Sequence, residues 1–196
     1  MTLKDKKIGF AMTGSFCTFE PIFEQMEQLM KTGADITPIF SNSVQNINCR
    51  FGKTEDFIKR VTDITGKPPV TTLETAEPIG PKKLLDLLLI APCTGNTLAK
   101  LNLAITDSPV LMAAKAHLRN ERPLVIFVST NDGLSMNFKN IGNLLNCKNI
   151  YFVPFTQDNY KLKPNSLVAE TSLILETLEA ALDGKQLQPI IRNPKQ

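Results

Sequence analysis

The stretch LLDLLLIAPCTGNT, residues 84–97, decides the fold, because it joins an apolar run to a small polar turn. Its first seven residues are aliphatic at every position but Asp86, without the alternation of a strand that has one wet face. Such a run is typical of a strand buried on both faces of a parallel sheet. Pro92 lacks an amide donor and Gly95 favours a turn, so we expect the strand to end here.

The turn that follows this strand predicts a helix from Thr97 to about Leu101. Thr94, Asn96 and Thr97 are all suited to capping a helix N-terminus. Amide N–H groups and hydroxyls are therefore expected to cluster at the carboxyl end of the central strand. In an open α/β sheet ligands bind at that end, and a helix N-terminus there favours an anion.

The rest of the chain alternates between apolar runs and segments with helical spacing. Strands are predicted at residues 7–12, 35–40, 124–128 and 149–153, and helices at residues 20–31, 54–65, 110–120 and 167–182. Ser108 followed by Pro109 indicates a helix start, whereas residues 155–165 indicate a long polar loop. With right-handed crossovers this order predicts an α/β fold, a single doubly wound Rossmann-like parallel sheet with helices on both faces. We expect one domain over residues 1–184 and a loosely held C-terminal tail over residues 185–196.

Hydroxyl, amide and glycine residues follow four of the predicted strands, at positions 13–15, 41, 92–97 and 129–132. The carboxyl ends of parallel strands meet at one edge, so these residues are expected to form a single rim. The rim has many hydrogen-bond donors but neither paired carboxylates nor a Ser-His-Asp set, so it offers little acid/base chemistry. Such a site can hold a phosphorylated cofactor, which would then supply the chemistry.

Composition narrows the possible classes of function. With 196 residues, of which 42% are hydrophobic and 21% charged, the chain can form one compact domain. A net charge of +3 without long Lys/Arg runs argues against nucleic acid, and the absence of a signal or membrane segment predicts a cytoplasmic protein. The four cysteines form no C-x-x-C pair, so no metal site is expected. The single histidine, His117, is interpreted as a surface or helix-end residue.

The segment APCTGNTLAK, residues 91–100, carries the most specific family likeness. It is similar to a P-A-S-A-N-T segment followed by an A-K helix start, and Thr13-Gly14-Ser15 and Ser41 match further positions of the same pattern. In these residues the chain resembles the homo-oligomeric flavin-containing flavoproteins. That family includes peptidyl-cysteine decarboxylases, phosphopantothenoylcysteine decarboxylase and the enzymes that form prenylated flavin. The resemblance spans roughly residues 6–153.

The resemblance implies a flavoprotein-type fold, a homo-oligomer and bound flavin mononucleotide (FMN). In it, the residues at strand ends hold the phosphate and ribityl chain, and the backbones at Cys93 and residues 129–131 approach the ring. The cofactor-binding residues predicted in this way are Thr13, Gly14, Ser15, Ser41, Pro92, Cys93, Thr94, Asn96, Thr97, Ser129, Thr130 and Asn131. NADP is the alternative cofactor, because a rim of donors does not distinguish one phosphorylated cofactor from another.

Two departures from the family pattern affect the predicted activity. His117 does not match the essential histidine of the decarboxylases, and most of the later P-x-M-N-x-x-M-W motif is missing around Asn137. A closer likeness within the family lies in PLVIFVSTNDGL (residues 123–134), NIYFVPFTQDN (149–159) and KPNSLVAE (163–170). It implies an oxidoreductase component of bacterial spore formation, which works with a separate A subunit to aromatise a small heterocyclic dicarboxylate.

Three roles remain open from the sequence. The chain could oxidise the substrate through FMN, act as a non-catalytic partner of a nicotinamide-dependent A subunit, or bind NADP directly. Lys161, Lys163 and Arg50 are candidates for neutralising substrate carboxylates, although solvated surface charge is the commoner role of such residues. No catalytic residue is predicted.

Overall fold

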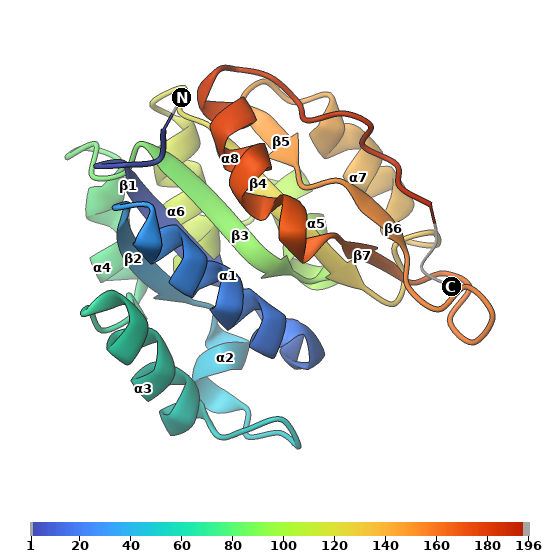
Figure 1. Cartoon of the computed structure of the whole chain (residues 1–196), viewed down its shortest axis with the longest axis horizontal. Coiled ribbons are helices and arrows are strands. Elements are labelled where there is room, and N and C mark those ends of the chain that lie inside the picture. Colours follow the sequence, from blue (N-terminus) through green and yellow to red (C-terminus); the bar gives the residue numbers. More distant parts are fainter. Residues whose placement is uncertain (1, 194–196) are drawn as a thin grey trace.

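The sheet has the strand order β2-β1-β3-β4-β7-β6, with β5 paired to β4 off this path (Figure 1). This computed structural model describes residues 2–193. It confirms the predicted α/β fold with helices on both faces of one sheet. The strands are β1 (Lys7–Met12), β2 (Asp35–Phe40), β3 (Leu87–Cys93), β4 (Leu124–Thr130), β5 (Ile150–Phe152), β6 (Phe155–Gln157) and β7 (Leu167–Ala169).

Strand β3 occupies the centre of the sheet and is buried at all seven positions. Its parallel neighbours are β1, where Ile8 pairs with Leu87, and β4, where Leu88 pairs with Leu124. The prediction that the strand ends before Pro92 was wrong, because β3 continues to Cys93. The register against β4 shifts between Ile90 and Cys93, and this irregularity accommodates a proline inside a central strand.

The C-terminal part of the sheet differs from the prediction, because β6 and β7 are antiparallel. The sheet is therefore mixed rather than wholly parallel. The predicted helix over residues 167–182 is a strand at its start, and helix α8 (Ile174–Leu182) begins only after a 3-10 turn. The reason is the length of β4. Strand β5 pairs with its first half only, so β7 provides the partner for Ser129 and Thr130.

The helices form two layers around this sheet. Helix α1 (Phe19–Lys31) and α8 lie against one face, whereas α6 (Pro109–Leu118) covers the other, with α4 (Leu73–Ala76), α5 (Gly95–Asn102) and α7 (Phe138–Leu145) beside it (Figure 1). Helix α3 (Thr54–Thr65) packs on α1 and β2, and the short α2 (Asn42–Asn46) follows β2. Between residues 2 and 193, no helix has both the length and the apolar character that crossing a membrane requires.

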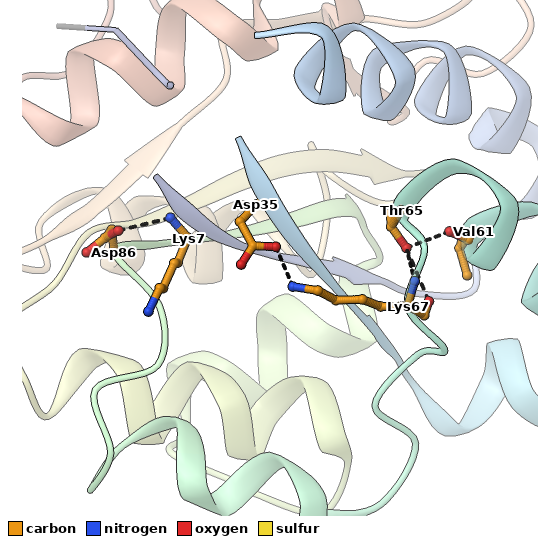
Figure 2. A network of polar contacts seen from close by, with 6 residues as sticks. All are labelled: Lys7, Asp35, Val61, Thr65, Lys67 and Asp86. Atoms are coloured by element: carbon orange, nitrogen blue, oxygen red, sulfur yellow. Dashed lines mark hydrogen bonds and ion pairs between the residues drawn. The ribbon is translucent and has the colours of Figure 1, made fainter. Parts of the chain in front are cut away.

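Polar contacts tie the loops at the amino-terminal edge of the sheet (Figure 2). The backbone N–H of Lys7 donates to Asp86 at 2.9 Å, and Asp35 forms an ion pair with Lys67. The Thr65 hydroxyl, at the end of α3, accepts from the Lys67 N–H at 3.2 Å. Because the Asp35–Lys67 pair is exposed, it adds at most about 1 kcal/mol. These contacts stabilise the fold at this edge. The candidate site lies at the opposite, carboxyl-terminal edge.

The predicted loosely held tail, residues 185–196, is tied down where the structure describes it. The Gln186 amide pairs with both backbone groups of Phe152, and Phe155 exchanges backbone hydrogen bonds with the segment around Ile191. The tail therefore extends the C-terminal side of the sheet as far as residue 193. Residues 194–196 lie outside the described part of the chain.

Candidate functional site

Two adjoining hollows lie at the carboxyl-terminal edge of the sheet. The larger has a volume of about 790 Å³ and the smaller about 90 Å³. Gly14 and Thr94 line both, so the two hollows meet at the ends of β1 and β3. The volume of the larger one falls in the range of roughly 300–1,000 Å³ that is typical of small-molecule sites. We call them the large cavity and the small pocket.

The small pocket contains a buried hydroxyl that has no partner. Ser41 is 8% exposed, and its Oγ forms no hydrogen bond with any atom among residues 2–193. An unpaired buried hydroxyl costs roughly 1–3 kcal/mol, so it marks a position where a ligand can supply the missing partner. The pocket is lined by Thr13, Gly14, Ser41, Asn42, Ser43, Thr94, Asn96, Thr97, Lys100, Ser108 and Leu111.

The N-terminus of helix α5 lies at the small pocket. The Oγ1 of Thr94 accepts from the Thr97 N–H at 3.3 Å, which confirms Thr94 as the cap, although the helix begins at Gly95 rather than at Thr97. The first amides of a helix have no intrahelical acceptor, and the helix dipole places partial positive charge there. Lys100, which also lines the pocket, is held 2.5 Å from Asp107. This donor set suits an anion of the size of a phosphate.

Hydroxyl side chains join the strand ends to one another. The Thr13 hydroxyl donates to the Pro92 carbonyl at 2.7 Å and accepts from the Thr94 N–H at 3.0 Å, which bridges β1 and β3. The Oγ atoms of Ser15 and Ser129 lie 2.7 Å apart and connect the loop after β1 to the end of β4. The strand ends therefore form one continuous rim.

The large cavity lies between the loop after β1 and the β6–β7 hairpin. On one side, the Phe16 ring stacks on Phe57 with the centroids 5.9 Å apart, which fixes that wall against α3. On the other side, the first residues of β7 complete the wall. The lining residues are Gly14, Ser15, Phe16, Cys17, Thr18, Cys49, Arg50, Phe51, Thr94, Ser129, Thr130, Asn131, Asp158, Lys163, Ser166, Leu167 and Val168.

The structure brings ten of the twelve predicted cofactor residues to these two hollows. The small pocket contains Thr13, Gly14, Ser41, Thr94, Asn96 and Thr97, and the large cavity contains Gly14, Ser15, Thr94, Ser129, Thr130 and Asn131. Pro92 and Cys93 line neither hollow. Burial raises the pKa of the Cys93 thiol well above its ordinary value, so it is a neutral core side chain. That any of these twelve residues binds a cofactor stays a prediction.

A polar network supports the rim beneath Thr130. The Thr130 hydroxyl donates to Asp132 at 2.5 Å, and the Asn137 amide donates to the other oxygen of the same carboxylate at 2.7 Å. Gly95 packs directly against this network, because a Cβ added there would lie within 2.7 Å of side-chain atoms of all three residues. The start of α5 can therefore approach the end of β4 only with a glycine at this position.

His117 takes no part in the site. It is 1% exposed in the last turn of α6, and its Nε2 lies 3.0 Å from the Pro123 carbonyl, the natural acceptor for an Nε2–H. Burial lowers its pKa from 6.5 to about 4, so the ring is neutral at physiological pH. The interpretation as a surface residue was wrong, although the helix-end position is correct. The rim consequently has no histidine acid or base.

Several lining residues were not among the twelve predicted cofactor residues, although Arg50 and Lys163 were candidates for neutralising substrate carboxylates. Arg50 and Phe51 lie at the tip of a turn, and no periodic pattern identifies such a tip as a cavity wall. Leu167 and Val168 were assigned to a helix, so the prediction did not place them beside the rim. The length and polarity of the predicted loop over residues 155–165 were the available signal. Its first three residues form β6, and Asp158 and Lys163 lie on the part that remains a loop.

The chain is similar to known flavoproteins in both sequence and structure. The profile of the family described as Flavoprotein matches residues 1–179. The chain is 49% identical over 190 residues to the B subunit of dipicolinate synthase from Bacillus subtilis (strain 168), covering 97% of this chain and 95% of the relative. The crystal structure of the corresponding B subunit from Bacillus halodurans is 48% identical, with a TM-score of 0.91 over the whole of both chains. The FMN-dependent cysteine decarboxylase SpaF has the same fold at 18% identity, with a TM-score of 0.65 over 92% of this chain and 99% of its own.

Proposed function

This chain belongs to the flavoprotein family, and we propose that it is the B component of a dipicolinate synthase and that it binds FMN at the carboxyl edge of its sheet. In this role it works with the A subunit of dipicolinate synthase to oxidise dihydrodipicolinate to dipicolinate during bacterial sporulation. The names and the identity of the relatives from two Bacillus species support the choice of reaction and of partner. Self-association is expected from the family, as is a cytoplasmic location.

The unpartnered Ser41 hydroxyl is the observation that carries the cofactor assignment. It lies in a pocket of donors at the N-terminus of α5, where the phosphate of FMN would find hydroxyls and amides. The adjoining cavity of about 790 Å³ can take a large planar ring. In this arrangement Ser41, Asn96 and Thr97 hold the phosphate and the ribityl chain.

The chain's own contribution to the reaction is binding and orientation. FMN, if bound there, would supply a two-electron acceptor for the dihydropyridine ring, which becomes aromatic when it loses a hydride to the acceptor and a proton to water. Ser15 and Ser129 present hydroxyls to the large cavity. A site without a histidine or a pair of carboxylates suits a reaction that needs little acid/base catalysis.

A second role is favoured by the burial of His117 away from both hollows. A site without the residue that serves the family's decarboxylases is compatible with a chain that has lost flavin chemistry. In that case the chain would be a non-catalytic partner, and the A subunit would carry a nicotinamide cofactor. Direct binding of NADP in the same two hollows is the third possibility.

Reconstitution separates these roles. Turnover of dihydrodipicolinate would be measured with this chain, the A subunit, FMN and NADP added singly and in combination. We expect turnover to require this chain and FMN together. Full activity without any flavin would refute the proposal. If turnover instead required NADP, and NADP bound to this chain in the absence of the A subunit, NADP rather than FMN would be its cofactor.

A further inference from the structure

The large cavity contains an unbalanced positive charge. Its charged lining residues are Arg50, Asp158 and Lys163, and the last two form an ion pair at 2.9 Å. Within residues 2–193, Arg50 forms no ion pair with any carboxylate. The wall therefore offers one guanidinium group without an ion pair and, on the loop between β6 and β7, one ammonium group that is partly neutralised.

The turn that carries Arg50 is fixed in place. Cys49 and Gly52 exchange backbone hydrogen bonds of 3.1 and 3.2 Å across it. Gly52 has φ +152°, and a Cβ added there would lie 2.8 Å from the ring of Phe57, so this close approach requires glycine. The Arg50 guanidinium lies 4.8 Å from the centre of the Phe51 ring. A planar cation resting on an aromatic ring keeps its N–H groups available for a bidentate contact with a carboxylate.

The loop that carries Lys163 is also preformed. The N–H of Lys163 donates to the Asn159 carbonyl at 2.6 Å, and the N–H of Asp158 donates to the Ser166 carbonyl at 3.1 Å. The hydrogen bond from Lys163 to Asp158 raises the pKa of the ammonium group, which stays charged. An ammonium group has three donors, so two remain after the contact with Asp158.

We propose that Arg50 binds one carboxylate of a planar ring dicarboxylate in the large cavity, and that Lys163 binds the second carboxylate beside Asp158. This assignment rests on the proposed function for the kind of reaction, and it adds the residues that select the substrate. Two cationic groups with a hydroxyl-lined floor between the loops favour a dianion over a monoanion. Arg50 is in this account the principal specificity residue.

Dipicolinate and picolinate are the probes that test this inference. Dipicolinate has the ring and both carboxylates, whereas picolinate lacks one of them. Each would be titrated calorimetrically, in buffer free of divalent cations, into the full chain with FMN, by itself and mixed with the A subunit. Where dipicolinate binds, picolinate is expected to bind about tenfold or more weakly, because one charged hydrogen-bonding contact is lost.

Variants assign the selectivity to particular residues. Arg50→Gln should weaken dipicolinate binding about tenfold to a hundredfold, whereas Asp158→Asn should strengthen it by freeing Lys163. Lys161→Gln is the matched control, because Lys161 lies on the same loop but does not line the cavity. It removes the same net charge and should leave the affinity unchanged.

The results that would overturn the inference are distinct from failure of the proposed function. Equal binding of the two probes, an unaltered Arg50→Gln variant, an equal loss in Lys161→Gln or no dipicolinate binding in any preparation would each refute it. The absorbance of added FMN is recorded in the same samples. Arg50-dependent binding without flavin uptake would refute the flavin assignment and leave this inference intact, and flavin uptake without dicarboxylate binding would do the reverse.

Discussion

Replacing Ser41 by alanine should stabilise the free chain and weaken its ligand binding at the same time. The Ser41 hydroxyl is buried without a partner among residues 2–193, and such a group costs roughly 1–3 kcal/mol. Its removal should therefore raise the free energy of unfolding by about 1 kcal/mol. For a chain of this length, that gain corresponds to a rise of about 2–4 °C in the melting temperature.

The same substitution should lower the affinity for FMN by about tenfold to a hundredfold. In the bound state the hydroxyl would donate to a charged phosphate oxygen, and a hydrogen bond to a charged group contributes about 1.5–3 kcal/mol. Differential scanning calorimetry of the ligand-free protein measures the change in melting temperature. Titration with FMN, followed by flavin fluorescence, measures the change in affinity.

Thr65→Val is the matched control for Ser41→Ala. Thr65 is also 8% exposed, but its hydroxyl is fully paired at the opposite edge of the sheet, where it donates to the Val61 carbonyl at 2.7 Å (Figure 2). Its loss should destabilise the chain by about 1–2 kcal/mol and leave FMN binding unchanged. A Ser41→Ala variant that melts at a lower temperature, or that binds FMN like the parent chain, would refute the reasoning.

Three further predictions concern the stability of the folded chain, at His117 and at two residues of the rim. Because burial lowers the pKa of His117 from 6.5 to about 4, the unfolded chain binds more protons in this range, and stability on the order of 3 kcal/mol is lost as the pH falls from about 6.5 to about 4. In His117→Gln, the free energy of unfolding by urea should depend less on pH between about pH 6.5 and pH 4. An unchanged pH dependence would assign the effect to another group. Thr13→Val leaves the Thr94 N–H without its acceptor, whereas the Pro92 carbonyl keeps the Thr13 N–H as a donor at 3.2 Å, so the substitution should cost about 1–3 kcal/mol in urea unfolding; a cost below about 0.5 kcal/mol would contradict the bridging role. Gly95→Ala should cost about 1–3 kcal/mol by thermal melting, whereas Gly142→Ala, where an added Cβ meets nothing within 4 Å, should stabilise by about 0.5–1 kcal/mol; equal effects would refute the close-packing argument.

Features that depend on local sequence were predictable. The uninterrupted apolar run before Pro92 places β3 at the centre of the sheet, because only a strand covered on both faces tolerates such a run. Ser108 followed by Pro109 marks the start of α6, and the Ser108 side chain does accept from the Leu111 N–H at 3.3 Å. Since parallel strands end at the same edge, the rim followed from the strand assignments.

Features that depend on pairing between distant segments were not predictable. The run at Leu167 has no local mark of a strand, and it becomes β7 only because the end of β4 lacks another neighbour. The position of Arg50 depends on how the turn at Gly52 packs against α3. The missing partner of Ser41 cannot be inferred from residue types at all, because it requires knowing every neighbouring donor and acceptor.

The visible absorption spectrum of the purified chain with FMN, followed by anaerobic addition of dihydrodipicolinate and the A subunit, tests the flavin assignment most directly. We expect a bound flavin spectrum that bleaches when the substrate is added, and a much weaker uptake of FMN by Ser41→Ala. A chain that takes up no FMN and leaves the spectrum unchanged while dipicolinate is formed would contradict it.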